Sequence, residues 1–243
     1  MGSSNSVNNP IVPGTQLSND ETGDGVDVTM FKQTVGSLMY LTTTRPDLMY
    51  RVSLISRFMA NPKSSHWLAA KRILRYIKGT TDFGILYKRG RSNAGLVSYT
   101  DSNYAGDLDD RKSTSGFAFI MGSGAISWAS KKQPIVSLST TEAEYIAAAF
   151  CACQCVWLRG ILEQLGAEEK GSTKILCDNN STIQLSKNPT FHGRSKDLVN
   201  DGAVKLSFCS TEEQIADIMT KPLKLEQFVK LRRMLEVIDA AEV

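Results

Sequence analysis

The stretch LVSYTDSNYAGDLDDRKSTSGFAFIMGSGAISWA, residues 96–129, decides the fold of this chain. Apolar and polar residues alternate within residues 96–101, 116–122 and 125–129, which is typical of half-buried β-strands. Turns rich in glycine and polar residues link these segments, and strands joined by short turns pair in antiparallel fashion. The stretch therefore predicts a three-stranded antiparallel meander.

The chain after this meander alternates between helical and strand patterns. We expect a long helix from about Thr141 to Leu165, ended by Gly166. Further elements are expected in this order: a strand over 174–178, a short helix over 181–187, a strand over 204–208, a helix that begins at Ser210 and is stopped by Pro222, and an amphipathic helix over about 225–237. This order predicts a mixed α/β domain with helices packed on a mixed sheet.

The chain before the meander divides into a polar segment and a helical region. Residues 1–29 contain no Lys, Arg or aromatic residue, and we expect them to form a flexible arm. In residues 30–92, Pro46 suits a helix start, and Ser64 or Ser65 can cap a second helix that Gly79 ends. The basic residues of that second helix are interpreted as a solvated polar face, with a nucleic-acid surface as the alternative: Lys71, Arg72, Arg75 and Lys78.

Composition is that of a soluble globular protein, since 42% of the 243 residues are hydrophobic and 22% are charged. A net charge of +3 is compatible with a nucleic-acid partner but does not argue for one. The five cysteines form no CxxC pair, which disfavours zinc and favours a reducing compartment. Because the apolar runs are short and no secretory signal is found, we expect no membrane partner and an intracellular location, cytoplasmic or nuclear, not secreted.

Four acidic residues suggest the chemistry of the chain. Asp101, Glu144, Asp178 and Asp217 each lie at the end of an expected strand or in the first turns of an expected helix. Carboxylates that converge on one sheet edge can hold two metal ions about 3.5–4 Å apart, which stabilise the attacking and the leaving oxygen of an in-line displacement at phosphorus. An open site of this kind suits Mg²⁺, with Mn²⁺ as a substitute.

The three aspartates also have ordinary structural roles open to them. Asp101 could start a turn after its strand, and Asp178 could cap the short helix that follows it. Asp217 could be a solvated acid on a helix. Taken one at a time, these positions do not establish a metal site.

Two glutamates compete for the place on the long helix. Glu144 could complete a capping box with Thr141, as Glu142 could with Ser139. Residues two apart on a helix point to nearly opposite sides, so one of the two glutamates faces the site. Helical geometry leaves the choice between them open.

Several segments resemble the C-terminal part of the polyprotein of a copia-type LTR retrotransposon. Three of them resemble the region that follows the polymerase active site: VGSLMYL (35–41), TRPDL (44–48) and AKRILRYIKGT (70–80). Six resemble its ribonuclease H domain: YTDSNYAGD (99–107), RKSTSG (111–116), WASKKQ (128–133), STTEAEY (139–145), CDNNS (177–181) and ADIMTKPL (216–223). Their occurrence together and in this order makes the resemblance specific.

The resemblance implies a fold and an activity. Residues 93–243 would form a ribonuclease H-like five-stranded mixed sheet flanked by helices, with a C-terminal helix, and residues 30–92 would be the end of a reverse transcriptase. The family pattern Ala-Glu-aromatic selects Glu144 over Glu142, and the other ligands carry over to Asp101, Asp178 and Asp217. The implied activity is metal-dependent cleavage of the RNA strand of an RNA/DNA hybrid.

Candidate substrate contacts follow from the same resemblance. The 2′-hydroxyls in the shallow minor groove of a hybrid would be recognised by polar side chains near the acids: Ser102, Asn103, Thr140, Asn179 and Asn180. Lys131 and Lys132 would contact backbone phosphates, with an ordinary solvated loop as the alternative.

The chain departs from the family pattern in two places. The paired aspartates of the polymerase are absent, so no DNA synthesis is expected and a separate polymerase domain is an expected partner. After Lys196, a segment of about three helical turns that family members carry is missing, which resembles an internal deletion. Two alternatives therefore accompany the nuclease: an impaired remnant that binds nucleic acid or protein, and a structural subunit that docks on a polymerase through residues 31–90.

Overall fold

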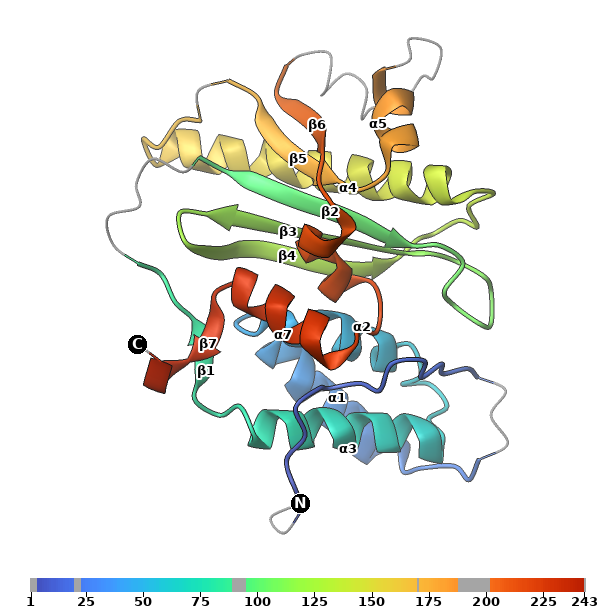
Figure 1. Cartoon of the computed structure of the whole chain (residues 1–243). Coiled ribbons are helices and arrows are strands. Elements are labelled where there is room, and N and C mark those ends of the chain that lie inside the picture. Colours follow the sequence, from blue (N-terminus) through green and yellow to red (C-terminus); the bar gives the residue numbers. More distant parts are fainter. Residues whose placement is uncertain (1–3, 20–22, 89–94, 170, 188–201, 243) are drawn as a thin grey trace.

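The computed structural model describes residues 4–19, 23–88, 95–169, 171–187 and 202–242, and its centre is a five-stranded mixed sheet (Figure 1). The strands are β2 (Val97–Asn103), β3 (Thr114–Met121), β4 (Gly124–Lys132), β5 (Thr173–Cys177) and β6 (Val204–Phe208). Their order in the sheet is β4-β3-β2-β5-β6. Strand β3 pairs in antiparallel fashion with both β2 and β4, and β5 pairs in parallel fashion with both β2 and β6. The predicted meander and the predicted mixed α/β fold are confirmed.

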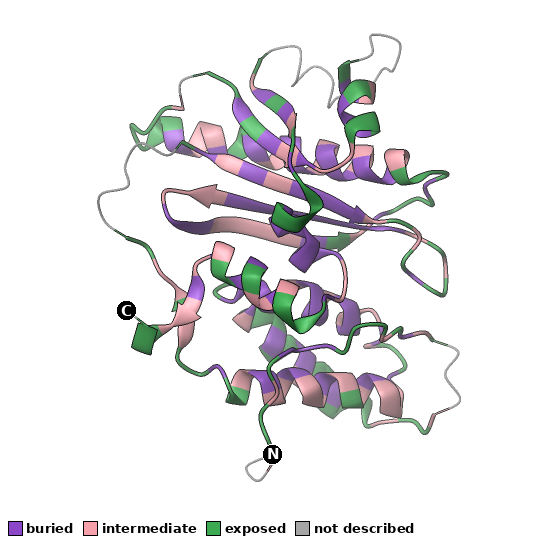
Figure 2. Cartoon of the chain, in the orientation of Figure 1, coloured by how far each residue is buried: buried purple, intermediate pink, exposed green. Residues whose placement is uncertain are grey.

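Helix α4 (Thr140–Gln164) covers one face of the sheet. Several of its sheet-facing residues are small, and Ala148, Cys151 and Cys155 are buried in a core with Phe117 and Ile175 of the strands. Figure 2 shows α4 as a mixture of buried, intermediate and exposed residues. Small side chains allow the helix axis to approach the sheet closely. The exposed Cys153 points away from Cys151 and Cys155, as the helical spacing predicts.

By length and composition, α4 could cross a membrane, because its 25 residues include a window of mean hydropathy 1.5. By length and composition alone, α4 therefore does not fit the expectation that every apolar run is too short for a membrane span. The buried face of α4, which includes Leu158 and Leu162, packs on the strands. A core helix of a soluble protein passes the same test, so composition alone does not indicate a span.

The opposite face of the sheet packs on a helical layer. This layer consists of α1 (Val28–Leu41), the 3₁₀ helix η1 (Pro46–Leu48), α2 (Met49–Ser56), α3 (Ser64–Lys78) and α7 (Leu225–Met234). Phe31, Ile55 and Phe228 are buried in one core with Ala118 and Ala125 of the sheet. The helical region and the sheet therefore share a continuous hydrophobic core, and the boundary predicted at residue 92 lies outside the described residues.

The cap of α3 differs from the prediction. Ser64 is already the first helical residue, and the cap position is Lys63, whose backbone N–H donates to Nδ1 of His66 at 2.9 Å. The cap that the sequence assigns to Ser64 or Ser65 is therefore wrong. The buried imidazole ring of His66, stacked on Phe58, accepts from the N–H of the cap residue, and no cap side chain accepts from the first turn.

The C-terminal part also differs from the prediction in two places. Asp217 lies on a 3₁₀ helix, η3 (Ile215–Met219), preceded by η2 (Thr211–Glu213), and not on a longer α-helix. Gln214 interrupts the helical path, because its side chain accepts from the N–H of Ala216 and donates to the carbonyl of Thr100 in β2. The helix expected to reach Val237 ends at Met234. Strand β7 (Val237–Asp239) follows and pairs with β1 (Phe83–Ile85), and the described chain closes with η4 (Ala240–Glu242).

The N-terminal segment is packed on the protein, in contrast to the expected flexible arm. Ile11 and Leu17 are buried, and the side chain of Asn9 donates to the carbonyl of Leu223 at 2.9 Å. Arg72 Nε donates to the carbonyl of Asn9 at 3.1 Å. Backbone groups, the amide of Asn9 and aliphatic side chains make these contacts, and composition alone does not show them.

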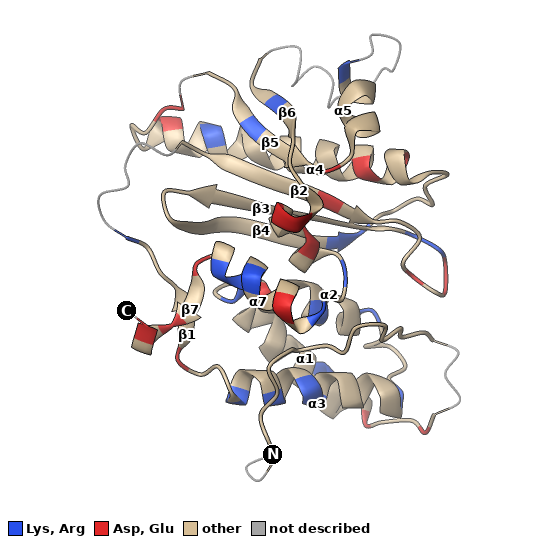
Figure 3. Ribbon diagram, in the orientation of Figure 1, with Lys and Arg blue, Asp and Glu red and all other residues tan. Residues whose placement is uncertain are grey.

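Other basic residues of α3 bind the same segment. Arg75 Nε donates to the carbonyl of Asn5 at 2.7 Å, and Lys78 Nζ donates to the carbonyl of Ser4 at 3.0 Å. Figure 3 shows the basic side of α3 next to the N-terminal chain. These cations therefore satisfy backbone carbonyls, a role that neither the solvated-face nor the nucleic-acid interpretation included.

Candidate active site

Asp101 lies within β2, opposite Gly116 of β3. The strand continues to Asn103, so Asp101 does not start a turn. The side chain is almost fully buried, and its Oδ2 accepts a hydrogen bond from Thr220 Oγ1. The same oxygen lies 3.4 Å from Lys221 Nζ. Asp101 is therefore a buried carboxylate on the central strand, in contact with the segment that follows η3.

The structure separates the two glutamates of α4. Glu142 has the capping role: its Oε2 accepts from the N–H of Leu138 at 2.7 Å, and its own N–H donates to Ser139 Oγ at 3.1 Å. Glu144 is buried and turned to the sheet, where its Oε1 accepts from the N–H of Ser102 at 3.3 Å. The first turn of α4 thus places Glu144 beside Asp101 and leaves Glu142 at the helix terminus.

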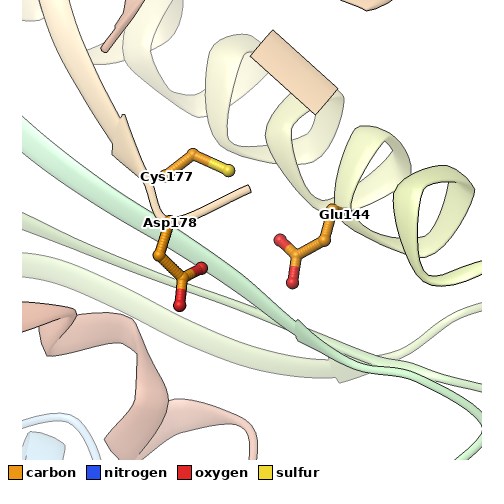
Figure 4. A group of neighbouring side chains, drawn as sticks. All are labelled: Glu144, Cys177 and Asp178. Atoms are coloured by element: carbon orange, nitrogen blue, oxygen red, sulfur yellow. The ribbon is translucent and has the colours of Figure 1, made fainter. Parts of the chain in front are cut away.

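Asp178 follows directly on β5 and faces Glu144. Oxygens of the two carboxylates lie within 4.8 Å of each other, and Figure 4 shows the carboxylate of Glu144 directed toward Asp178. Asp178 does not cap α5 (Asn180–Lys187), because Asn179 Oδ1 accepts from the N–H of Thr182 at 3.1 Å. Asp178 Oδ2 instead accepts from Thr211 Oγ1 at 2.9 Å.

Cys177 lies in the same group but is a poor ligand candidate. Its sulfur is also within 4.8 Å of the oxygens of Glu144 and Asp178. Burial raises the pKa of the Cys177 thiol to about 12, so it is a neutral thiol at physiological pH. Metals take the thiolate, and Mg²⁺ prefers oxygen ligands. Cys177 is better described as a core residue of β5.

Asp217 completes the group through Lys221. Asp217 is buried on η3, and its Oδ1 lies 2.9 Å from Lys221 Nζ, which also reaches Asp101. Strand β6 pairs with β5 along its whole length, from Thr173↔Val204 to Cys177↔Phe208. The last strand before η3 therefore lies in the sheet. The apparent deletion after Lys196 falls in residues 188–201, outside the described residues.

The proximity of the acids shifts their protonation. Burial, together with repulsion from Asp101 and Asp178, raises the pKa of Glu144 to about 9. Burial, together with repulsion from Asp101, raises the pKa of Asp217 to about 7 although Lys221 opposes the shift. Carboxylates that resist ionisation in this way are stabilised by any cation that binds among them.

The donor set fits divalent magnesium. Asp101, Glu144, Asp178 and Asp217 offer hard carboxylate oxygens, and Oε2 of Glu144 is buried without a hydrogen-bond partner in the described part of the chain. Such an oxygen is costly unless a cation or a water molecule satisfies it. The residues that would hold the ions are these four.

The candidate substrate residues lie at the same sheet edge but differ in availability. Cross-strand register aligns Ser102 with Ser115 and Lys131, and Asn103 with Thr114 and Lys132. Lys131, Thr140 and Asn180 are exposed to solvent, and Lys131 Nζ lies over the ring of Phe150 at 5.6 Å. The other residues already have contacts within the protein. Ser102 is buried, Asn179 caps α5, and Lys132 forms ion pairs with Asp107 at 2.7 Å and Asp110 at 2.9 Å.

Several residues that organise the site are not among the predicted site residues. Thr220 and Lys221 contact the acids directly, although they stand within the quoted segment ADIMTKPL. Gln133 is buried behind Ser102, and its Nε2 donates to Ser115 Oγ and to the carbonyl of Ala143, both at 2.9 Å. The signal for Lys221 is its position four residues after Asp217, on the same side of a helical turn.

Comparison with known proteins then identifies the relatives of the chain. No family model matches it. Over 209 residues, 82% of this chain, it is 43% identical to the retrovirus-related Pol polyprotein from transposon TNT 1-94 of Nicotiana tabacum. The chain belongs to the copia-type retrotransposon Pol family. It is also 41% identical over 222 residues, 87% of this chain, to the Pol polyprotein from transposon RE2 of Arabidopsis thaliana.

This Pol-family chain spans 16% and 15% of the lengths of those two polyproteins. Among solved structures, it is similar to the N-terminal ribonuclease H domain of a Mycobacterium tuberculosis protein, at 10% identity and a TM-score of 0.40, over 58% of this chain and 98% of the other. The family of the chain rests on its Pol relatives.

Proposed function

We propose that this chain is an endonuclease of the ribonuclease H type, which hydrolyses the RNA strand of RNA/DNA hybrids with two Mg²⁺ ions. The observation that carries the proposal is the convergence of four buried or half-buried carboxylates from β2, α4, β5 and η3 on one sheet edge. A structural core does not require four acids so close together, since unpaired buried carboxylates destabilise a fold. Such an arrangement can hold two metal ions for phosphodiester hydrolysis.

The residues have distinct roles in this proposal. When bound, the two ions would supply an activated water nucleophile and stabilise the departing oxygen. Asp101 lies between Glu144 on one side and Lys221 and Asp217 on the other, so it would serve both metal positions. The backbone N–H of Ser102 orients Glu144, and the hydroxyl of Thr211 orients Asp178. Such hydrogen bonds fix the direction of the ligand oxygens before a metal enters.

Substrate recognition would fall to the exposed residues around the acids. Thr140, Asn180 and Lys131 are exposed and are proposed to contact the 2′-hydroxyls and phosphates of the hybrid. Lys132 is expected to contribute less, because Asp107 and Asp110 already neutralise it. Ser102 and Asn179 would act through their effect on Glu144 and α5.

The experiment that tests the function is cleavage of an RNA/DNA hybrid labelled on its RNA strand. Purified protein in Mg²⁺ should cut the RNA internally and leave 5′-phosphates, whereas EDTA and Glu144→Gln should abolish cutting. Glu163→Gln is the matched control, because Glu163 is an exposed glutamate of the same helix. Circular dichroism would confirm that each variant is folded.

A folded protein that binds the hybrid without cutting it would contradict the nuclease and support the impaired remnant.

The polymerase partner implied by the family stays a prediction. Co-expression with a Pol-family polymerase domain, followed by size-exclusion chromatography, would test it. Tyr40 and Met39 of α1 are exposed apolar residues that such a partner could cover.

A further inference from the structure

A single lysine lies among the four acids at the position where a cation would bind. Lys221 Nζ is 2.9 Å from Asp217 Oδ1 and 3.4 Å from Asp101 Oδ2, so the ammonium group bridges two carboxylates that come from η3 and β2. Glu144 and Asp178 form the other half of the group. In the described part of the chain, no other lysine or arginine forms an ion pair with any of these four acids.

We propose that Lys221 is an internal placeholder cation, which occupies the metal position between Asp101 and Asp217 and must leave it for Mg²⁺ to bind there. The inference rests on the proposed metal site and adds a competition between this lysine and the ion. A metal ligand lies about 2.0–2.1 Å from Mg²⁺. An ammonium bound between the same two oxygens would repel an ion placed there.

The main chain at Lys221 is held, so that only its side chain needs to move. The carbonyl of Lys221 accepts a hydrogen bond from Arg51 Nη1 of α2 at 3.1 Å, and the guanidinium of Arg51 is buried. The next residue is Pro222, whose ring fixes its own φ angle. Thr220, on the other side, is tied to Asp101 through its hydroxyl. The displacement is thus confined to a flexible four-carbon side chain.

A neighbouring pocket can receive the displaced ammonium. Lys221 itself lines a pocket of about 330 Å³ together with Tyr50, Asn103, Tyr104 and Arg111. The side chain of Lys221 keeps 33% of its surface exposed, in contrast to the buried acids it contacts. Rotation of the side chain into this polar pocket would leave the oxygens of Asp101 and Asp217 to the ion, without breaking the contacts of the main chain.

A placeholder has consequences that differ from those of an ordinary structural ion pair. Without metal, Lys221 supplies the positive charge that two buried carboxylates need, so its removal should destabilise the fold. With metal, the ion supplies that charge, so removal should cost little and should favour binding. A structural pair that stays in place would instead cost the same stability with and without metal.

Isothermal titration of Mg²⁺ and Mn²⁺ into the Lys221→Met protein tests the competition without any measurement of cleavage. Lys221→Met should bind metal about five-fold or more tightly than the parent, since a unit charge at this range is felt even at the dielectric of water. Lys221→Arg, which keeps the charge, should not gain affinity. Lys230→Met is the matched control, because Lys230 is exposed on α7, and its affinity should equal that of the parent.

Urea unfolding of the same proteins gives a second result. In EDTA, Lys221→Met should unfold at lower urea than the parent, and saturating Mg²⁺ should close that difference. Weaker or unchanged metal binding by Lys221→Met, or a stability difference that persists in Mg²⁺, would overturn the proposal. A protein that binds Mg²⁺ in the expected way but does not cut hybrids would contradict the proposed nuclease and leave the placeholder intact.

Nuclear magnetic resonance of the parent protein covers the case in which Lys221→Met does not fold. The side-chain ¹⁵N signal of the Lys221 ammonium should show slow hydrogen exchange in EDTA and lose that protection when Mg²⁺ is added. An ammonium signal that is unaffected by saturating Mg²⁺ would show that Lys221 is not displaced and would overturn the proposal. Absence of metal binding in both the parent and the variant would do the same.

Discussion

Gly116 of β3 lies directly under Met219 of η3, and a Cβ atom on Gly116 would come within 2.6 Å of the Cβ of Met219. The same atom would lie 2.6 Å from Cγ2 of Thr220. Since Gly116 is also the cross-strand partner of Asp101, the absent side chain lets η3 descend onto the sheet beside that carboxylate. The proximity of Asp101 to Asp217 and Lys221 depends on this close approach.

Gly116→Ala is therefore expected to push η3 away from the sheet and to weaken metal binding and cleavage. The loss of stability should be about 1–3 kcal/mol, as for other overpacked cores. Gly160→Ala is the control with the opposite expected sign. A Cβ there meets nothing within 4 Å, and alanine is favoured over glycine in a helix by about 0.5–1 kcal/mol. Urea unfolding of both variants measures whether Gly116→Ala lowers stability and Gly160→Ala raises it. A Gly116→Ala protein as stable as the parent would contradict the close packing.

Replacement of each glutamate at the start of α4 should have a different effect. Glu144→Gln removes a metal ligand, so metal affinity should fall by more than the ~10–100-fold typical of outer-shell partners. Glu142→Gln removes only a charged cap at the helix terminus, so it should lower stability by up to about 1 kcal/mol and leave metal affinity unchanged. Titration calorimetry with Mn²⁺ measures both. Equal losses of affinity would show that the two residues are not separated as the structure has them.

Stability in EDTA should fall as pH rises from about 5 to about 9. The raised pKa values of Glu144, about 9, and Asp217, about 7, lie above the value of about 4 expected in the unfolded chain. The folded protein therefore holds more protons than the unfolded chain in this window, and stability decreases as those protons are released. Lys221, whose pKa is raised by Asp101 and Asp217 against the effect of burial, stays charged throughout.

Urea midpoints at several pH values check this trend. Glu144→Gln should flatten it, because glutamine has no proton to release, and saturating Mg²⁺ should oppose it by stabilising the ionised carboxylates. A midpoint in EDTA that rises from pH 5 to pH 9 would contradict the assignment of the raised pKa values to the folded state.

The helical region depends on a buried polar network around Asp47. Asp47 accepts two hydrogen bonds from Arg45, at 2.9 and 2.8 Å, and one from the hydroxyl of Tyr76 at 2.7 Å. Asp47→Ala leaves the buried guanidinium of Arg45 without its partner and should cost about 3–5 kcal/mol. Glu242→Gln, which breaks the exposed pair with Arg233, should cost about 0–1 kcal/mol. Thermal unfolding distinguishes the two, and similar shifts would argue against the network.

Removal of residues 1–19 tests the packing of the N-terminal segment. Burial of an aliphatic side chain contributes about 1.5–3 kcal/mol, so loss of Ile11 and Leu17 should lower stability measurably. The guanidinium groups of Arg72 and Arg75 on α3 would also lose the carbonyl acceptors that this segment provides. A truncated protein as stable as the parent would support the flexible arm that composition suggests.

The sequence by itself determined the parts of this protein that depend on local patterns. Alternation of apolar and polar residues specified β2, β3 and β4, and helical spacing with Gly166 specified α4, because neighbouring residues decide these elements. The segment Ala-Glu-Tyr, read through the family resemblance, selected Glu144 as a metal ligand, which stays a prediction, and in the structure Glu142 has the capping contacts.

Only the tertiary structure decided the features that arise from contacts between distant parts of the chain. The pairing of β1 with β7 joins residues more than 150 positions apart, and the burial of Ile11 depends on helices that composition cannot place beside it. Lys221 looks like one surface lysine among many in the sequence. It lies on Asp101 because Gly116 and Gln214 bring η3 down onto the sheet, and a pattern of neighbouring residues cannot encode that distance.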